Sequence, residues 1–140
     1  ANLSFANLSR ANLSRANLSG VKHDLTTTWP NVSIVPQVGQ FHAFKKLSGG
    51  SIARLLIPRS AKRVGGMVGR KCRSSKAKVI SIVDSKGNPV NEGTSPTNAL
   101  KLVYRVGEWI KPDSFDDDFV KECTNGIHFF MTEKEAMEYT

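Results

Sequence analysis

The residues of this sequence that are best suited to chemistry are basic, and they lie close together in the middle of the chain. Between Ser48 and Val83 there are nine Lys and Arg residues and no Asp or Glu. In a loop with Gly65, Gly66 and Gly69, such side chains and exposed backbone N–H groups could both reach phosphate oxygens. The candidate polyanion-binding residues are therefore Arg59, Lys62, Arg63, Arg70, Lys71, Arg73 and Lys76.

The acidic residues lie in a different part of the chain. From Asp113 to the C-terminus there are eight acids and two lysines, although the whole chain has a formal net charge of +8. The basic segment could bind an external polyanion, or it could pair with this acidic region within one chain or between copies. The sequence leaves both interpretations open. The run from Asp116 to Asp118 lacks the alternating ligands and the glycine of a calcium loop, and carboxylates at a helix start explain it better.

Other kinds of site have less support in the pattern. The segment from Gly65 to Lys71 lacks the spacing of a Walker A loop, which argues against nucleotide hydrolysis of that type. Aromatic residues do not alternate with the basic ones, so base stacking on a single strand has little support. Cys72, Cys123, His42 and His128 lack the paired spacing of a zinc site, and we predict no metal and no cofactor. We also predict that the two cysteines are thiols, not a disulfide.

Short segments with β-branched and aromatic residues would have to position these groups. We predict strands at 31–35, 40–47, 51–57, 76–83, 100–106 and 126–131. Ser48–Gly50 and Asp84–Asn88 are typical of tight turns. Thr132 and Glu135 form a capping-box pattern that predicts a C-terminal helix, and a short helix is possible at 114–123. These elements indicate a small α+β domain rich in antiparallel strands at residues 38–140, preceded by a linker at 21–37.

The first 20 residues repeat with a period of five. Each unit begins Ala-Asn-Leu-Ser, four times in register, and this period fits neither a helix nor a strand. The pattern resembles the pentapeptide-repeat family, whose consensus is Ala-(Asp/Asn)-Leu-x-x. That resemblance implies one coil of a right-handed quadrilateral β-helix, with Leu3, Leu8, Leu13 and Leu18 pointing inward. The expected fold class is thus mainly β or α+β. One such coil cannot bury its leucines alone and needs a neighbour, which could be further repeats, the following domain or another subunit.

A second resemblance covers residues 38–140. It rests on the string from Arg70 to Val79, the string from Tyr104 to Glu108 and the string from Glu122 to Phe130. These strings are similar to an uncharacterised domain at the C-terminal end of pentapeptide-repeat proteins of large DNA viruses and phages. The resemblance implies a viral protein, located in the cytoplasm of the infected cell or in the virion, and it implies no activity.

A third, looser resemblance suggests an enzyme. Gly126-Ile127-His128-Phe129-Phe130 is similar to the Gly-Ile-Tyr-Phe strand of ADP-ribosyltransferases, and Gln40-Phe41-His42-Ala43 to their His-Gly strand. In that family His42 would contact the nicotinamide ribose, and His128 would replace a stacking Tyr. Ala43 replaces the expected Gly, and no Glu is identifiable at the catalytic position.

These observations favour a non-enzymatic structural or interaction module that binds another macromolecule through its head and stem. The expected partner is a protein or a second copy that stacks on the open coil, and nucleic acid is also possible. No apolar run is long enough to cross a membrane, and we expect a soluble protein. The alternatives are the ADP-ribosyltransferase-like enzyme and phosphate or nucleic-acid binding through residues 54–78.

Overall fold

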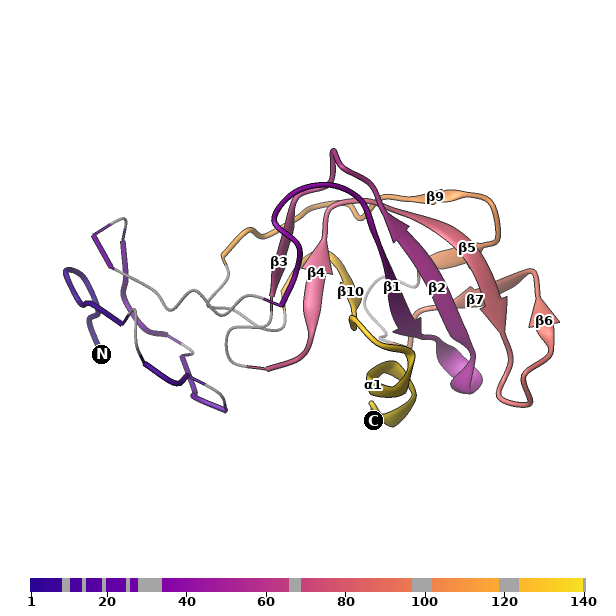
Figure 1. Cartoon of the computed structure of the whole chain (residues 1–140), viewed down its shortest axis with the longest axis horizontal. Helices are drawn as coiled ribbons and strands as arrows, with labels where there is room; N and C mark the ends of the chain where they lie inside the picture. Colours follow the sequence, from indigo (N-terminus) through magenta and orange to yellow (C-terminus); the bar gives the residue numbers. More distant parts are fainter. Residues whose placement is uncertain are drawn as a thin grey trace.

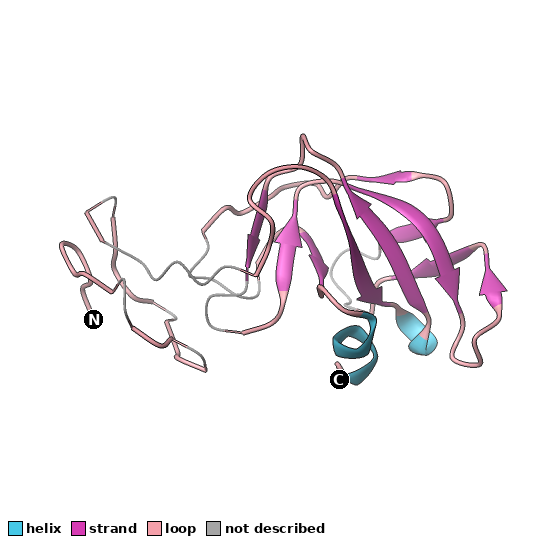
Figure 2. Ribbon diagram, viewed as in Figure 1, coloured by secondary structure: helices cyan, strands magenta, loops and turns pink. Residues whose placement is uncertain are grey.

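The computed structural model describes residues 1–8, 11–13, 15–18, 20–24, 26–27, 34–65, 69–96, 102–118 and 124–139. These residues form a mainly β protein with antiparallel sheets and one short helix (Figures 1 and 2). The repeats lie at one end of the molecule, apart from the labelled strands (Figure 1). We refer to the repeats as the stem and to the strand-rich part as the head. The described part of the chain contains no helix with the length and apolar character needed to cross a bilayer.

The largest sheet has β5 at its centre and is antiparallel throughout. Its strands follow the order β1-β2-β5-β6, and β9 also pairs with β5. Their bounds are β1 (Phe41–Lys46), β2 (Ile52–Ile57), β5 (Ala77–Val83), β6 (Pro89–Val90) and β9 (Trp109–Ile110). The turn predicted at Ser48–Gly50 joins β1 to β2, and Gly49 in it has a left-handed φ of 76°, which glycine adopts readily. The turn at Asp84–Asn88 is also confirmed, since Asp84 N–H donates to Asn88 O at 2.8 Å.

A bulge in β5 determines which of its side chains face solvent. Arg54 pairs with Ser81 and Leu55 pairs with Val79, so Ile80 is the extra residue. The bulge interrupts the alternation of the strand, and two consecutive residues, Ile80 and Ser81, are exposed. Val79 and Ile82 on either side remain buried in the core.

A second sheet continues the first one along its β1 edge. It has the order β10-β4-β3, with β3 (Arg63–Gly65), β4 (Cys72–Ser74) and β10 (Ile127–Phe129). Two hydrogen bonds between Phe44 and Phe130, 2.8 and 2.7 Å long, connect it to β1. Figure 1 shows β3, β4, β10, β1 and β2 as one curved layer. A separate hairpin pairs β7 (Glu92–Thr94) with β8 (Val103–Arg105).

The core lies inside this curved layer. It contains fully buried aliphatic and aromatic side chains from all three sheets, among them Leu55, Val79, Tyr104, Ile127 and Phe129. The strands predicted at 40–47, 51–57, 76–83, 100–106 and 126–131 correspond to β1, β2, β5, β8 and β10. The strands β3, β4, β6, β7 and β9 were not predicted.

Two predicted elements differ from the structure. Residues 34–35 are not in a strand, and residues 31–33 of that predicted strand lie outside the described residues. Residues 114–118 are not helical, so the prediction of a helix start there is wrong, and 119–123 lie outside the described part. The backbone carbonyls of Asp116 and Asp118 instead accept hydrogen bonds from Arg73, each at 3.0 Å.

The C-terminal helix is confirmed as α1 (Glu133–Glu138). Thr132 is its N-cap, and its Oγ1 accepts a hydrogen bond from Glu135 N–H at 3.2 Å. The Thr132 hydroxyl also donates to the Glu135 carboxylate at 3.0 Å. Ala136 is the buried residue of this helix, and it packs near Ile52 and Phe130.

The chain lies beside its own start again after the 20 residues of the stem. Asn2 and Lys22 pair in parallel, with Leu3 N–H donating to Lys22 O at 2.6 Å and Lys22 N–H donating to Ala1 O at 2.9 Å. One turn closes in each repeat, with N–H donors on Ala6, Ala11, Ala16 and Val21 and carbonyl acceptors on Leu3, Leu8, Leu13 and Leu18. Phe5, Arg15 and Gly20, in three of these turns, have φ of 65°, 63° and 72°, as type II turns require.

Side chains of the stem alternate in exposure in step with the repeat. Leu3, Leu8, Leu13 and Leu18 are half-buried, whereas the asparagine before each of them is exposed. Residues from the expected linker also bind the stem. Phe5 N–H donates to Thr26 Oγ1, and the Thr27 hydroxyl donates to Leu3 O, both at 2.8 Å.

Candidate functional site

The outer face of the largest sheet brings an exposed tryptophan next to basic side chains. The strand registers place His42 opposite Leu56, Leu56 opposite Lys78, and Lys78 opposite Trp109, so these residues form one row across four strands. Trp109 is 48% exposed. The Nζ of Lys76 lies 4.5 Å from its ring centroid, and that of Lys78 lies 5.8 Å from it. We call this row, together with Lys76, the tryptophan row.

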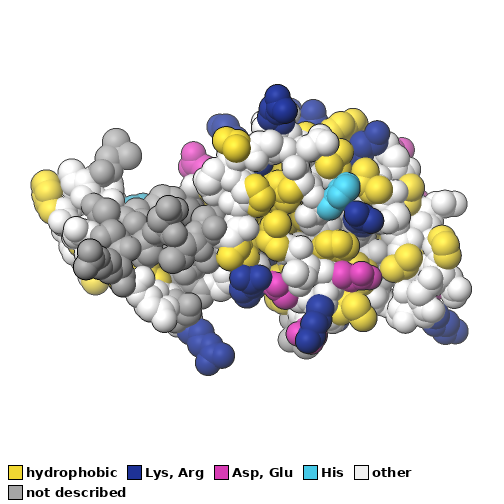
Figure 3. All heavy atoms as spheres, in the orientation of Figure 1, with side chains coloured by type: hydrophobic (Ala, Val, Ile, Leu, Met, Phe, Trp, Pro, Cys, Tyr) yellow, Lys and Arg dark blue, Asp and Glu magenta, His cyan; other side chains and the backbone are white. Residues whose placement is uncertain are grey.

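The tryptophan row has further basic and apolar neighbours. Arg54 is exposed, and its Nη2 lies 3.3 Å from His42 Nδ1. Ile80, the bulge residue, is 38% exposed. Figure 3 shows histidine, basic and hydrophobic side chains side by side over the part of the surface formed by β1 and β2. The face therefore combines positive charge with apolar area.

Two of the candidate polyanion-binding arginines have their guanidinium groups on protein carbonyls. Arg63 donates to the carbonyls of Gly39 at 2.6 Å and Pro58 at 2.7 Å, and to those of Pro36, Arg59 and Ala61. Burial lowers its pKa. Arg73 is 1% exposed and holds the carbonyls of Asp116 and Asp118. Both residues anchor irregular segments to the second sheet.

Two other candidate polyanion-binding residues, Arg70 and Lys71, contact the region of the C-terminal helix. Arg70 binds Glu135 through two hydrogen bonds, Nε to Oε2 at 3.1 Å and Nη2 to Oε1 at 2.8 Å. The hydrogen bond from Arg70 is the main cause that lowers the pKa of Glu135. Lys71 donates to the Tyr139 hydroxyl at 3.0 Å. Among these contacts, the Arg70–Glu135 pair corresponds to the intramolecular pairing that the charge pattern suggested.

The three remaining candidates are placed differently. Arg59 and Lys62 are exposed, and Lys76 lies at Trp109. The structure therefore does not bring all seven candidates to one surface.

A cavity of about 190 Å³ opens on the inner side of β1. Its wall includes Lys45, Tyr104 and His128, together with Asp113 and Asn125 from neighbouring loops. Lys45 Nζ donates to the His128 carbonyl at 3.1 Å and lies 5.8 Å from the centroid of the Tyr104 ring. A smaller cavity of about 40 Å³ shares Lys45 and His128 in its wall.

Burial controls the protonation of the groups in this wall. It lowers the pKa of Lys45 to about 8, and the charge of Lys71 contributes to the same shift. It also raises the pKa of Tyr104. It lowers the pKa of His128 to about 4, although the hydrogen bond between His128 Nε2 and Thr124 O, 2.6 Å long, acts in the opposite direction. His128 and Tyr104 are therefore neutral near pH 7.

The two histidines of the enzyme hypothesis do not share a cavity. His128 lines both cavities, whereas His42 is exposed on the outer face and contacts Arg54. Because side chains alternate along a strand, His42 and Lys45 of β1 lie on opposite faces. A nicotinamide site that needs both His42 and His128 has no geometric basis here.

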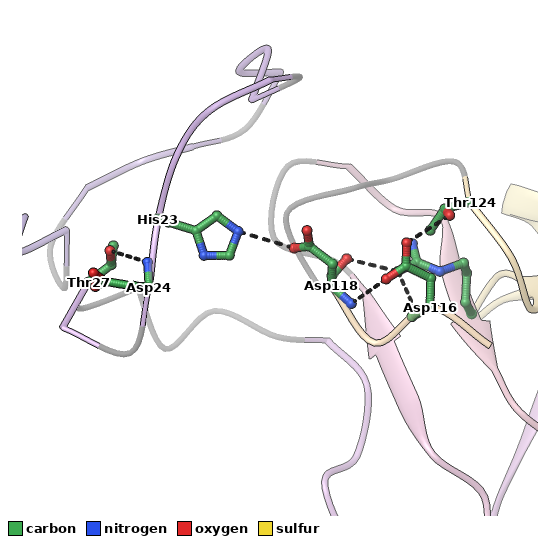
Figure 4. Close-up of polar contacts among 7 residues, drawn as sticks. His23, Asp24, Thr27, Asp116, Asp118 and Thr124 are labelled. Carbon is green, nitrogen blue, oxygen red and sulfur yellow. Dashed lines mark hydrogen bonds and ion pairs between the residues drawn. The ribbon is translucent and has the colours of Figure 1, made fainter. Parts of the chain in front are cut away.

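A polar contact joins the segment that follows the stem to the head. His23 Nε2 lies 3.4 Å from Asp118 Oδ1, and Figure 4 shows the imidazole of His23 pointing at that carboxylate. Asp116 holds the same loop, since its carboxylate accepts hydrogen bonds from Asp118 N–H and the Thr124 hydroxyl, both 2.9 Å long. Hydrogen bonds within the head therefore hold Asp118 in place.

The described residues contain no cluster of three His, Cys, Asp or Glu side chains that could hold a metal ion. Cys72 has a buried thiol, and its Sγ lies 3.6 Å from Arg70 O. Cys123 lies outside the described residues, so the absence of a disulfide between Cys72 and Cys123 stays a prediction.

Sequence reasoning did not identify Lys45, Tyr104 or Trp109. Lys45 is next to Lys46 in a strand, and nothing in the local pattern shows which of the two faces inward except the alternation from Ala43. Trp109 is 31 positions from Lys78, so only the strand pairing reveals that they are neighbours.

Two family models match the chain. Residues 31–136 match the model of a family of unknown function (DUF5758). Residues 1–22 match the model of pentapeptide repeats (8 copies), which agrees with the resemblance of the first 20 residues. No curated protein and no solved structure matches the chain. The matches assign no activity to the head.

Proposed function

We propose that this chain, which belongs to a family of unknown function (DUF5758), is a non-enzymatic interaction module with a repeat stem and a β-rich head. In this proposal the head binds single-stranded nucleic acid through the tryptophan row. The observation that carries the proposal is the exposed indole of Trp109 beside the ammonium groups of Lys76 and Lys78.

The chemistry of the row suits this partner. An exposed indole can stack on any base, and such stacking contributes about 1–3 kcal/mol per base. Lys76, Lys78 and Arg54 can contact the phosphates on either side of that base, and the net charge of +8 favours the approach of a polyanion. Apolar contact with Ile80 and Leu56 adds area without sequence preference. We therefore expect binding with little dependence on sequence.

Fluorescence anisotropy with a labelled oligothymidylate tests the proposal. Trp109→Ala should weaken binding by about 5- to 150-fold, because it removes one stacking platform of about 1–3 kcal/mol. Val38→Ala, at another exposed apolar position, should bind like the wild type. Lys76→Gln with Lys78→Gln should flatten the slope of log affinity against log salt by about 1.4, the value for two contacts with a single strand.

The variants must first be shown to melt at the temperature of the wild type. Binding that is equal for Trp109→Ala and Val38→Ala would contradict the proposal. Absence of binding by the wild-type protein at about 50 mM salt, where phosphate contacts are strong, would also contradict it.

For the stem, we propose one coil of a right-handed quadrilateral β-helix that stacks on the coil of a second copy. The turn in each repeat and the parallel pairing of Asn2 with Lys22 support this geometry. The coil has half-buried leucines, and repeat units of this kind gain stability from a stacked neighbour. A second copy offers the same backbone groups and the same apolar layer.

Sedimentation velocity over a range of concentrations tests the stem. The wild type should form a dimer as concentration rises, and Leu8→Asp should remain monomeric because it places a charge in the apolar layer. Asn12→Asp adds the same charge at an exposed position and should still dimerise. A wild type that stays monomeric would reject the stacking. A viral origin and a location in the infected cell or virion are further proposals, supported by the resemblance of the two segments.

A further inference from the structure

Lys45 is half-buried, and its desolvated ammonium lies in the wall of the 190 Å³ cavity. A lysine ammonium has three N–H donors. One of them donates to the His128 carbonyl at 3.1 Å. The ion pairs among the described residues do not include Lys45. A buried charge without a counterion is costly, so a group that supplies a negative charge here would be strongly favoured.

The charges around Lys45 point to the same kind of ligand. Lys46 and Lys71 line the small cavity next to Lys45, and the described wall of that cavity contains no carboxylate. In the large cavity, Asp113 is the acid of the described wall, and it is exposed to solvent. The described walls around Lys45 therefore contain three lysines and one exposed carboxylate.

We propose that this cavity binds a small organic anion, whose phosphate or carboxylate contacts the ammonium of Lys45 and whose hydroxylated body lies against Tyr104, Asn125 and Asp113. The volume is suitable for such a molecule. At about 30 Å³ for each water, the cavity has room for about six waters, the size of a three-carbon phosphate ester. Tyr104 and Asn125 supply hydrogen-bonding groups for hydroxyls.

The protonation of Lys45 gives this site a distinctive pH dependence. In the unliganded protein its pKa is about 8, and a bound anion would raise it. Binding should therefore weaken about tenfold between pH 7 and about pH 9, whereas binding to exposed lysines would persist to about pH 10. His128, with a pKa of about 4, and Tyr104, with a raised pKa, stay neutral over this range. Lys46, Lys71 and Asp113 are the other charged groups that face the site from the described residues.

Isothermal titration with glycerol 3-phosphate, glycerate and glycerol tests the proposal on the full chain. We expect glycerol 3-phosphate or glycerate to bind with the pH dependence given above, and glycerol not to bind. Comparison of the two anions shows whether phosphate or carboxylate is preferred. Lys45→Met should abolish binding, and Lys111→Met, at an exposed lysine, should leave it unchanged.

A second measurement keeps the test valid if Lys45→Met fails to fold. The titration of Lys45 Nζ, followed by NMR in the wild type, should shift to higher pH when about 10 mM of the binding anion is present. An unchanged titration of Lys45, or binding that Lys45→Met retains, would overturn the proposal. Failure of both anions to bind would overturn it as well.

Discussion

Gly65 and Cys72 face each other in the ladder between β3 and β4, and their backbones approach closely there. A Cβ at Gly65 would lie 2.6 Å from the Cα of Cys72 and 2.9 Å from its Sγ. The φ of Gly65 is +142°, which residues with a side chain rarely adopt. Because Cys72 is fully buried, the strands cannot separate without disturbing the core. Both the space and the backbone at this position therefore require glycine.

Gly65→Ala should lower the free energy of unfolding by about 2–4 kcal/mol, through backbone strain and overlap with Cys72. Gly87→Ala is the matched control, because Gly87 also has a positive φ, +85°, but no heavy atom lies within 4 Å of its added Cβ. Its cost should be about 1 kcal/mol, from strain alone. Urea unfolding of both variants measures the difference. Equal costs would mean that the contact with Cys72 is unimportant.

Arg73 is a second residue whose buried position restricts substitution. Its Nη2 donates to the carbonyls of Asp116 and Asp118, each at 3.0 Å, whereas a lysine would bury a more strongly hydrated ammonium at a different point of this site. Arg73→Lys should therefore destabilise the protein by about 2–3 kcal/mol. Arg59→Lys, at an exposed position, should change stability by less than about 0.5 kcal/mol. Thermal melting compares the two, and a stable Arg73→Lys protein would show that the guanidinium group is not required at this position.

At the scale of elements, local pattern identified the three longest strands, β1, β2 and β5, and missed five strands of two or three residues. The strands β1 and β2 contain aromatic and aliphatic residues, which are typical of strands. In β4, Cys72, Arg73 and Ser74 are all buried, so no alternation exists, and the charge of Arg73 suggested a solvated loop. The two-residue strand β9 is too short for any pattern, and only its pairing with β5 defines it.

The C-terminal helix depends on its cap because it has only six residues. Thr132→Ala removes the Oγ1 that accepts the hydrogen bond of Glu135 N–H, and it should cost about 1 kcal/mol. Thr132→Ser keeps the hydroxyl and should retain most of the stability. Thermal unfolding measures both. The cap would have no role if the alanine and serine variants melted at the same temperature.

At the scale of the whole molecule, composition and repeat period predicted a mainly β chain with a repeat segment at its start. The candidate sites depend on pairings between distant segments. The cavity wall combines Lys45 of β1, Tyr104 of β8 and His128 of β10, and the tryptophan row combines β5 with β9. No local pattern specifies such pairings. The charge asymmetry was visible in the sequence. The sequence did not show that Arg63 and Arg73 would bind backbone carbonyls of the protein itself.

The same long-range packing makes stability depend on pH. His128 is an ordinary histidine in the unfolded chain, with a pKa near 6.5, and burial in the folded head lowers that pKa to about 4. Between these values the unfolded chain binds more protons than the folded one, so stability falls as pH falls. The lowered pKa of Lys45 has the same sign, but its window lies between about pH 10.5 and pH 8.

Thermal melting between pH 7 and about pH 4 should therefore show a loss of roughly 2–3 kcal/mol that depends on His128. His128→Gln should flatten this part of the curve, because glutamine stays neutral and can still donate to the Thr124 carbonyl. His42→Gln, which replaces an exposed histidine of the same sheet layer, should keep the fall of the wild type. Carboxylates with lowered pKa values, such as Glu135, begin to add their own loss as pH falls through their ordinary pKa of 4.5. If His42→Gln flattened the curve and His128→Gln did not, the buried histidine would not be the source of the pH dependence.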